Sequence, residues 1–204
     1  MLAILNFNAG NLRSVSRALN FLQIEHCVTS SLIKIQKAQG LIFPGVGTAG
    51  AAMQFLREQN LLGLLQNHLQ QNKPFLGICL GLQVLFASSA EGPTKCLGYF
   101  PGSVYKLKPR PGICVPQIGW NKVTLRKSTK LLAGIKTETP FYFLNSYFSF
   151  TPQRSLIYAT TQHGHVIPAV VAQGNIYGVQ FHPEKSSQAG LRVLQNFAKI
   201  ALTQ

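Results

Sequence analysis

Residues 75–83 read Phe75-Leu-Gly-Ile-Cys79-Leu-Gly-Leu-Gln83 and give the strongest local indication of the fold. Its apolar start predicts a buried strand over 75–79, and the pattern then resumes as a helix over Gly81–Ala87. A cysteine between two glycines at such a junction is typical of a nucleophile elbow, because a tight turn requires small neighbours and lifts the nucleophile clear of the sheet. The alternative is a buried cysteine beside glycines that pack a helix on a strand.

Apolar strands and amphipathic helices alternate on both sides of this stretch. Before it, we expect strands at Leu2–Phe7, Cys27–Thr29 and Gly40–Phe43, and helices opening at Gly10-Asn11 and covering Leu32–Ala38, Ala49–Arg57 and Leu61–Gln70. After it, we expect strands at Ser103–Leu107, Lys122–Leu125, Phe141–Leu144, Leu156–Thr160, Val166–Ala172 and Ile176–Phe181, and a last helix over Gln188–Ala201. This order predicts an α/β fold with a mostly parallel sheet covered by helices on both faces.

Length and composition limit the class of protein. The chain has 204 residues, of which 46% are hydrophobic, so we expect one globular domain over residues 1–204, with two domains as the alternative. It has no run of 18 apolar residues and no basic N-terminal leader, which predicts a cytoplasmic protein with no membrane partner. Its four cysteines include no C-x-x-C pair, which argues against a zinc site, and we expect all but Cys79 to be small buried apolar residues.

The net charge of +14 results from missing acids more than from added bases. Nineteen Lys and Arg stand against five Glu and no Asp, and nine of the bases lie between Lys95 and Lys136. Such a charge suggests nucleic-acid binding, but the basic segment has no recognisable nucleic-acid-binding motif. We therefore expect no nucleic-acid partner, and the absence of Asp has no physical explanation in the sequence.

A thiol nucleophile needs a base, and His182 is the best placed of the five histidines. It ends an apolar strand in Val179-Gln-Phe-His-Pro-Glu184, at the sheet edge where the elbow presents Cys79. Pro183 fixes the chain direction, so Glu184 can orient the imidazole as the third member of a triad does. The other histidines are expected to be structural (His26), solvated (His68) or beside a hairpin turn (His163 and His165).

Hydrolysis through a tetrahedral intermediate also requires donors for an oxyanion. The N–H group of Leu80 follows the nucleophile directly. The segment Pro44-Gly45-Val46-Gly47 follows a strand, and its glycines allow backbone N–H groups to approach a ligand closely. A plain strand-to-helix turn is the alternative for this segment.

With these residues in place, the chain resembles the class I glutamine amidotransferases. The resemblance rests on G-I-C-L-G-L-Q around Cys79 and on F-H-P-E at residues 181–184. More narrowly, the chain is similar to the glutaminase subunits of imidazole glycerol phosphate synthase, the HisH family. Four further segments carry that similarity, which spans residues 2 to about 198: Gly10–Val15, Phe43–Gly47, Val115–Asn121 and Gly178–Ser186.

The resemblance implies a flavodoxin-like sheet with extra short antiparallel strands in the second half, and a function. Glutamine would be hydrolysed to glutamate and ammonia by a Cys79–His182–Glu184 triad without metal or cofactor. The ammonia would pass to a (β/α)₈-barrel synthase subunit, HisF, in a heterodimer that makes imidazole glycerol phosphate in histidine biosynthesis. The implied oxyanion and substrate residues are Gly45, Gly47, Leu80, Gln83, Ser146 and Tyr147. The implied partner-facing residues are Asn11, Pro116, Gln117, Gly119, Trp120 and Lys185.

Two departures from the family pattern concern the subunit interface. The family usually opens with D-Y-G-x-G-N, but this chain has Asn6 in place of the Asp, which changes the expected local hydrogen bonding. The family usually has His before Ser-Tyr, and this chain has Asn145, which is expected to affect coupling between the partner and the glutamine site.

Three other functions are kept as alternatives. A sister amidotransferase subunit would serve anthranilate, pyridoxal phosphate or nucleotide synthesis, but Gly119-Trp-Asn121 argues against it. A non-catalytic binding module would not need an intact triad. A nucleic-acid binder would use the basic segment Lys95–Lys136.

Overall fold

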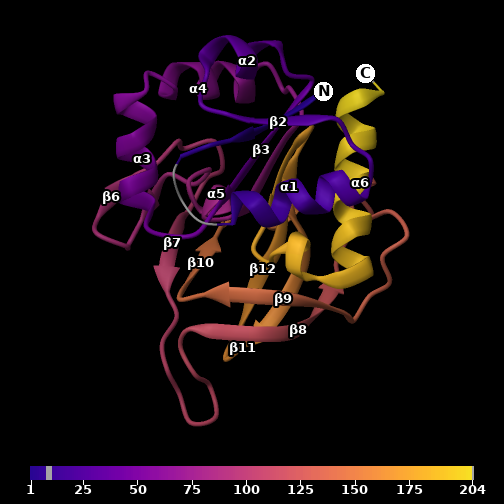
Figure 1. Cartoon of the computed structure of the whole chain (residues 1–204). Helices are drawn as coiled ribbons and strands as arrows, with labels where there is room; N and C mark the ends of the chain where they lie inside the picture. Colours follow the sequence, from indigo (N-terminus) through magenta and orange to yellow (C-terminus); the bar gives the residue numbers. More distant parts are fainter. Residues whose placement is uncertain (8–10, 204) are drawn as a thin grey trace.

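A nine-stranded sheet forms the centre of the computed structural model, which describes residues 1–7 and 11–203 (Figure 1). Five of its strands are parallel to their neighbours. In spatial order they are β2 (His26–Thr29), β1 (Leu2–Leu5), β3 (Gly40–Gly45), β4 (Phe75–Cys79) and β13 (Ile176–Val179). The fold class predicted from the alternation of strands and helices is confirmed.

The sheet continues beyond β13 as an antiparallel block. In spatial order it contains β12 (His165–Gln173), β11 (Ile157–His163), β8 (Gln117–Leu125) and β9 (Thr139–Asn145). These strands have seven or nine residues and are longer than the short strands expected from the resemblance. The predicted turn between the histidines at 163 and 165 is confirmed, because Gly164 has φ 68° and joins β11 to β12.

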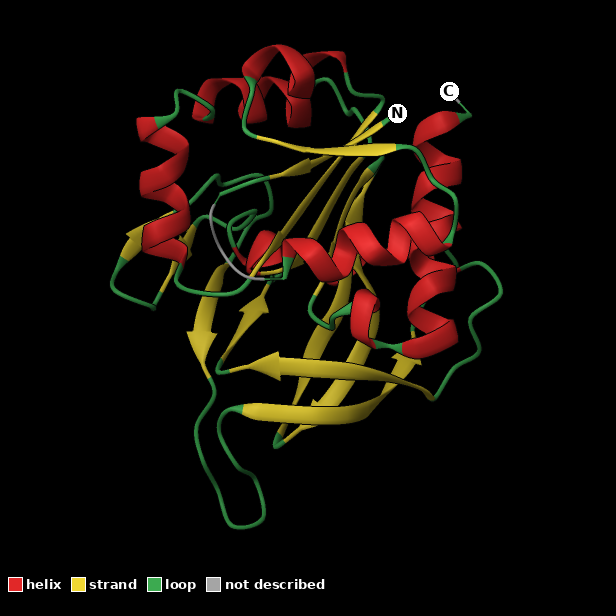
Figure 2. Ribbon diagram, in the orientation of Figure 1, coloured by secondary structure: helices red, strands yellow, loops and turns green. Residues whose placement is uncertain are grey.

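A second sheet of four strands lies beside the first (Figure 2). Its order is β10 (Tyr147–Phe150), β7 (Ser103–Lys106), β5 (Ser88–Ser89) and β6 (Thr94–Lys95). Only β7 was expected. The two-residue strands β5 and β6 leave no periodic pattern in a sequence, and the four-residue strand β10 was missed as well. The sheet matters for function because β10 directly follows Ser146, one of the implied substrate residues.

Helices cover both faces of the parallel strands, as the alternation predicts. On one face lie α1 (Leu12–Phe21) and α6 (Ser187–Leu202), and on the other lie α2 (Leu32–Lys37), α3 (Ala49–Glu58), α4 (Leu62–Gln70) and α5 (Leu80–Gln83). Three 3₁₀ turns complete the chain: η1 (Lys130–Leu132), η2 (Arg154–Leu156) and η3 (Pro183–Lys185). The expected helix start at Gly10 lies outside the described residues.

The two hydrophobic cores follow from the alternation of side chains along each strand. In β1, Leu2 and Ile4 pack with α1 and α6, whereas Ala3 and Leu5 pack with α2, α3 and α4. All four side chains are fully buried. The four inner parallel strands β1, β3, β4 and β13 are buried along their whole length, which explains why they read as continuous apolar runs.

Helix α5 is shorter than the sequence predicts, since it ends at Gln83 and not at Ala87. The carbonyls of residues 84–86 accept hydrogen bonds from backbone N–H groups of residues 97–100. The Leu85 and Phe86 N–H groups donate to carbonyls three residues back, and the Ala87 N–H donates to the Gly102 carbonyl, so the α-helical bond from Ala87 to Gln83 is not made. The chain then turns from the elbow into β5.

Two predictions about single residues are wrong. His68 is buried and its Nε2 lies 3.1 Å from the Pro74 carbonyl, so it is not solvated. Its helix face packs on Phe75, and burial lowers the pKa of this imidazole. Cys114 is exposed and Cys27 half-buried, whereas Cys96 is buried as expected and burial raises its pKa to about 11. Among the described residues, no helix has the length and apolar character needed to cross a bilayer.

Candidate active site

Cys79 lies at the end of β4, in a backbone conformation that only a tight elbow produces. Its φ is 54° and its ψ is −101°, a region that costs a non-glycine residue about 1–3 kcal/mol. A Cβ atom at Gly77 would lie 2.3 Å from the Gly81 carbonyl oxygen, and one at Gly81 would lie 1.8 Å from the Phe43 oxygen. Both positions therefore require glycine, as the motif predicts.

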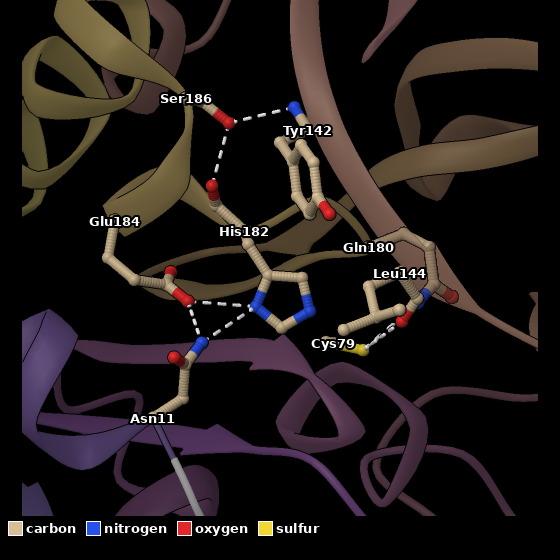
Figure 3. A network of polar contacts seen from close by, with 8 residues as sticks. All are labelled: Asn11, Cys79, Tyr142, Leu144, Gln180, His182, Glu184 and Ser186. Atoms are coloured by element: carbon tan, nitrogen blue, oxygen red, sulfur yellow. Dashed lines mark hydrogen bonds and ion pairs between the residues drawn. The ribbon is translucent and has the colours of Figure 1, made fainter. Parts of the chain in front are cut away.

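The end of β13 brings His182 to the same edge of the sheet as Cys79. Its Nδ1 lies 2.8 Å from Oε1 of Glu184, which belongs to the first turn of η3. The two side chains are only 1% and 0% exposed. Figure 3 shows the free Nε2 edge of the ring facing the Cys79 thiol. The structure thus brings the three predicted triad residues together, with the imidazole between the carboxylate and the thiol.

Backbone contacts fix the position of His182 further. The Ser186 hydroxyl donates to the His182 carbonyl at 2.6 Å and accepts from the Tyr142 N–H at 2.9 Å. The His182 N–H donates to the Tyr142 carbonyl at 2.8 Å. Strand β9 therefore holds the base both directly and through Ser186 (Figure 3).

Asn11 contributes a contact to the triad that the sequence did not predict. Its Nδ2 donates to Glu184 Oε1 and lies 3.3 Å from His182 Nδ1 (Figure 3). The carboxylate oxygen that orients the imidazole thus accepts two hydrogen bonds. The resemblance implies a partner-facing role for Asn11, but here its side chain points to the triad.

The electrostatics of the site favour a protonated imidazole. Burial lowers the pKa of His182, but the negative charges of the Cys79 thiolate and the Glu184 carboxylate outweigh burial and raise the pKa to about 10. In the described part of the chain, His182–Glu184 is the one ion pair, although the chain has 19 basic residues. The site can therefore hold a protonated imidazole beside Cys79 at neutral pH.

A pocket of about 270 Å³ opens over the thiol. Besides Cys79, it is lined by five of the six predicted oxyanion and substrate residues: Gly47, Leu80, Gln83, Ser146 and Tyr147. Gly45 is buried below it as the register partner of Cys79, where a Cβ atom would meet the Phe7 ring at 2.7 Å. Glu91 also lines the pocket, and its carboxylate accepts from the Ala49 N–H at 3.2 Å. In the sequence, the only indication of a role for Glu91 was that the chain has just five acidic residues.

The segment Ser146-Tyr147 is held by amide side chains on its pocket side. Gln83 Nε2 and Asn145 Nδ2 both donate to the Tyr147 carbonyl, each at 3.0 Å. The Ser146 carbonyl accepts from the Leu107 N–H at 2.8 Å. Asn145, the residue that departs from the family pattern, therefore connects the end of β9 to the pocket through its hydrogen bond to Tyr147.

The implied partner-facing residues differ in their exposure. Trp120 is 54% exposed and its ring lies 6.1 Å from that of Tyr142, over which the Lys185 ammonium sits at 5.6 Å. Pro116 is exposed but also lines the pocket, and Gly119 has φ 124° in the middle of β8. Gln117, in contrast, is only 3% exposed.

Comparison with known proteins shows which family has this sequence pattern. The profile of the family described as "Glutamine amidotransferase class-I" matches residues 4–201. The imidazole glycerol phosphate synthase subunit HisH of Trichodesmium erythraeum is 43% identical over 198 residues, covering 96% of this chain and 92% of the relative. The subunit of the same name from Caldanaerobacter subterraneus subsp. tengcongensis is 40% identical, with 98% of each chain covered.

Solved structures show the same fold at much lower identity. A crystal structure described as a glutamine amidotransferase superposes with a TM-score of 0.77 at 19% identity, covering 98% of each chain. A chain in the structure of PurLQS from Thermotoga maritima superposes with a TM-score of 0.74 at 15% identity, covering 96% of each chain. In the described residues, no group of three or more His, Cys, Asp or Glu side chains could hold a metal ion.

Proposed function

The chain belongs to the class-I glutamine amidotransferases, and we propose that it hydrolyses glutamine with the Cys79–His182–Glu184 triad and delivers the ammonia to a synthase partner. Its relatives named HisH support its place as the amidotransferase subunit of an imidazole glycerol phosphate synthase in histidine biosynthesis. The observation that carries the proposal is the buried imidazole, bound to Glu184 on one side and facing the elbow thiol on the other.

Acylation begins with the thiolate. The Cys79 sulfur attacks the side-chain carbonyl carbon of glutamine, and the C=O electron pair moves to oxygen to give a tetrahedral oxyanion. The N–H groups of Leu80 and of the Val46-Gly47 loop lie at the pocket and serve as its donors. When the oxyanion collapses, the C–N bond breaks, His182 gives its proton to the departing ammonia, and a thioester remains on Cys79.

Deacylation reverses the role of His182. The imidazole takes a proton from a water molecule, the resulting hydroxide attacks the thioester carbonyl, and the S–C bond breaks to release glutamate. The proton held on His182 restores the starting ion pair. Glu184 keeps Nδ1 protonated throughout, so that Nε2 faces the reacting atoms.

The pocket offers complementary groups for the amino-acid end of glutamine. Glu91 is the acidic side chain at its edge and is suited to bind the α-ammonium group. The backbone of Ser146-Tyr147, held by Gln83 and Asn145, lines the pocket and suits the α-carboxylate. A volume of about 270 Å³ is adequate for a single amino acid and too small for a peptide.

The partner proposed for this chain is a (β/α)₈-barrel synthase subunit of the HisF type, joined in a heterodimer. The exposed side chains of Trp120 and Lys185 pack around half-buried Tyr142 next to the triad, on β8, η3 and β9, and suit such a contact. A barrel seated there would cover the site and receive ammonia before it mixes with water. This work would take place in the cytoplasm.

An electrophilic glutamine analogue tests the nucleophile. Incubation with 6-diazo-5-oxo-L-norleucine should modify Cys79, and excess glutamine should protect it, because label and substrate occupy the same pocket. Peptide mass spectrometry locates the label, and exposed Cys114 serves as the control for nonspecific reaction. Modification of Cys114 with Cys79 left free would refute the proposal.

A further inference from the structure

Gln180 lies between β13 and His182 and is fully buried. Its Nε2 donates to Cys79 Sγ at 3.6 Å, and the Leu144 carbonyl accepts from the same thiol at 3.7 Å (Figure 3). Neither contact was expected from the sequence. The nucleophile thus has a donor and an acceptor of its own, separate from the triad.

These two neighbours act differently on the two protonation states of the sulfur. The Leu144 carbonyl can only accept, so it stabilises the neutral thiol, which has a proton to give. The amide N–H can only donate, and a hydrogen bond to an ionised acceptor is roughly twice as strong as one to a neutral acceptor. Gln180 therefore stabilises the thiolate more than the thiol.

The orientation of the amide follows from the same two contacts. If its oxygen faced the sulfur, two oxygen acceptors would compete for the single thiol proton and neither could stabilise a thiolate. With Nε2 toward the sulfur, Oε1 is directed away from it and is buried without a hydrogen-bond partner among the described residues (Figure 3). An unpaired buried oxygen lowers stability, and an apolar side chain of similar length would remove that cost. Groups that lower stability in this way are characteristic of functional sites.

We propose that Gln180 is a further catalytic residue, which stabilises the Cys79 thiolate before it attacks and again when it leaves the thioester. In the second step the S–C bond breaks and its electron pair returns to sulfur, where the amide N–H receives the charge. The inference rests on the proposed function, because that function makes Cys79 the nucleophile.

Alkylation of Cys79 by iodoacetamide at a series of pH values tests the role without using glutamine. The titratable groups that face the thiol are His182, with Glu184 behind it, and Glu91 and Tyr147 in the pocket. All of these are unchanged in Gln180→Met, which keeps the length of the side chain and removes its donor. Peptide mass spectrometry measures Cys79 and exposed Cys114 in the same sample, so Cys114 is the internal reference.

We expect Gln180→Met to slow Cys79 alkylation at neutral pH by about 10-fold or more, to move the pH profile to higher pH, and to lower kcat/KM for glutamine by about 10- to 100-fold. Cys114 should react as before, and Tm should stay equal or rise. The matched control is Ser149→Ala, which also removes a buried unpaired oxygen but lies on β10, and it should leave the alkylation profile unchanged.

An unchanged pH profile of Cys79 alkylation in folded Gln180→Met would overturn the inference. A lower kcat/KM together with a lower Tm, and with no change in alkylation, would overturn it as well. If Gln180→Met does not fold, Gln180→Asn, which shortens the reach of the amide by one methylene, gives the same comparison. Failure of the proposed function would show differently, as a wild-type chain that releases no glutamate from glutamine when it is bound to its synthase partner.

Discussion

Substitution of Asn145 by Ala should weaken glutamine binding without affecting the nucleophile. Asn145 Nδ2 is one of two amide donors on the Tyr147 carbonyl, and Gln83 supplies the other at the same distance of 3.0 Å. Loss of one neutral hydrogen bond costs about 0.5–1.5 kcal/mol, and each 1.4 kcal/mol is about tenfold in affinity. We therefore expect KM for glutamine to rise about 2- to 10-fold, with kcat nearly unchanged.

The assay is steady-state glutamate release by the complex of the chain with its synthase partner. Asn196→Ala is the matched control, since Asn196 is also 6% exposed and donates to two carbonyls, but on α6, away from the pocket. It should lower Tm and leave KM unchanged. The double variant with Gln83→Ala should show a coupling energy, because the two donors share one acceptor. A wild-type KM in Asn145→Ala, or a loss of kcat alone, would show that this hydrogen bond does not support glutamine binding.

Three more predictions follow from the triad and the charge. Glu184→Gln should lower kcat less than His182→Ala does, because it weakens the orientation of the ring and leaves the base in place; parallel kinetics of both variants check this. The pKa of His182 is raised to about 10, so its contribution to stability is complete below about pH 6.5 and is lost as pH rises toward 10. The free energy of unfolding, measured with urea, should therefore fall more steeply over this pH range in the wild type than in His182→Asn. Association with the partner should slow as salt rises, because a chain at +14 favours an acidic docking face; stopped-flow rates independent of salt would contradict this steering.

The elbow could be predicted because its requirements are local. Gly77 and Gly81 are needed by contacts within the strand, the turn and the neighbouring β3, and the apolar run on one side defines β4. The pairing of His182 with Glu184 was also predictable, because only Pro183 separates them. The single-domain organisation of residues 1–204 and the cytoplasmic location stay predictions.

Contacts between distant segments could not be predicted in this way. Asn11 reaches the triad across 173 positions of sequence, and Gln180 reaches Cys79 across 101. A polar residue two positions before His182 at the end of an apolar strand was the available signal for Gln180. His68 looked solvated because its helix is polar by composition, yet the side chain is held by the Pro74 carbonyl. In each case the tertiary packing decides which polar group finds a partner.

In the proposed function, Cys79 releases ammonia from glutamine for use by a separate synthase subunit. The most direct measurement compares wild-type and Cys79→Ala chains, each in complex with the barrel synthase partner, for formation of imidazole glycerol phosphate from glutamine and from an ammonium salt. Cys79→Ala should form no product from glutamine and should form product from ammonium at close to the wild-type rate. Product from glutamine at an undiminished rate in Cys79→Ala would contradict the account.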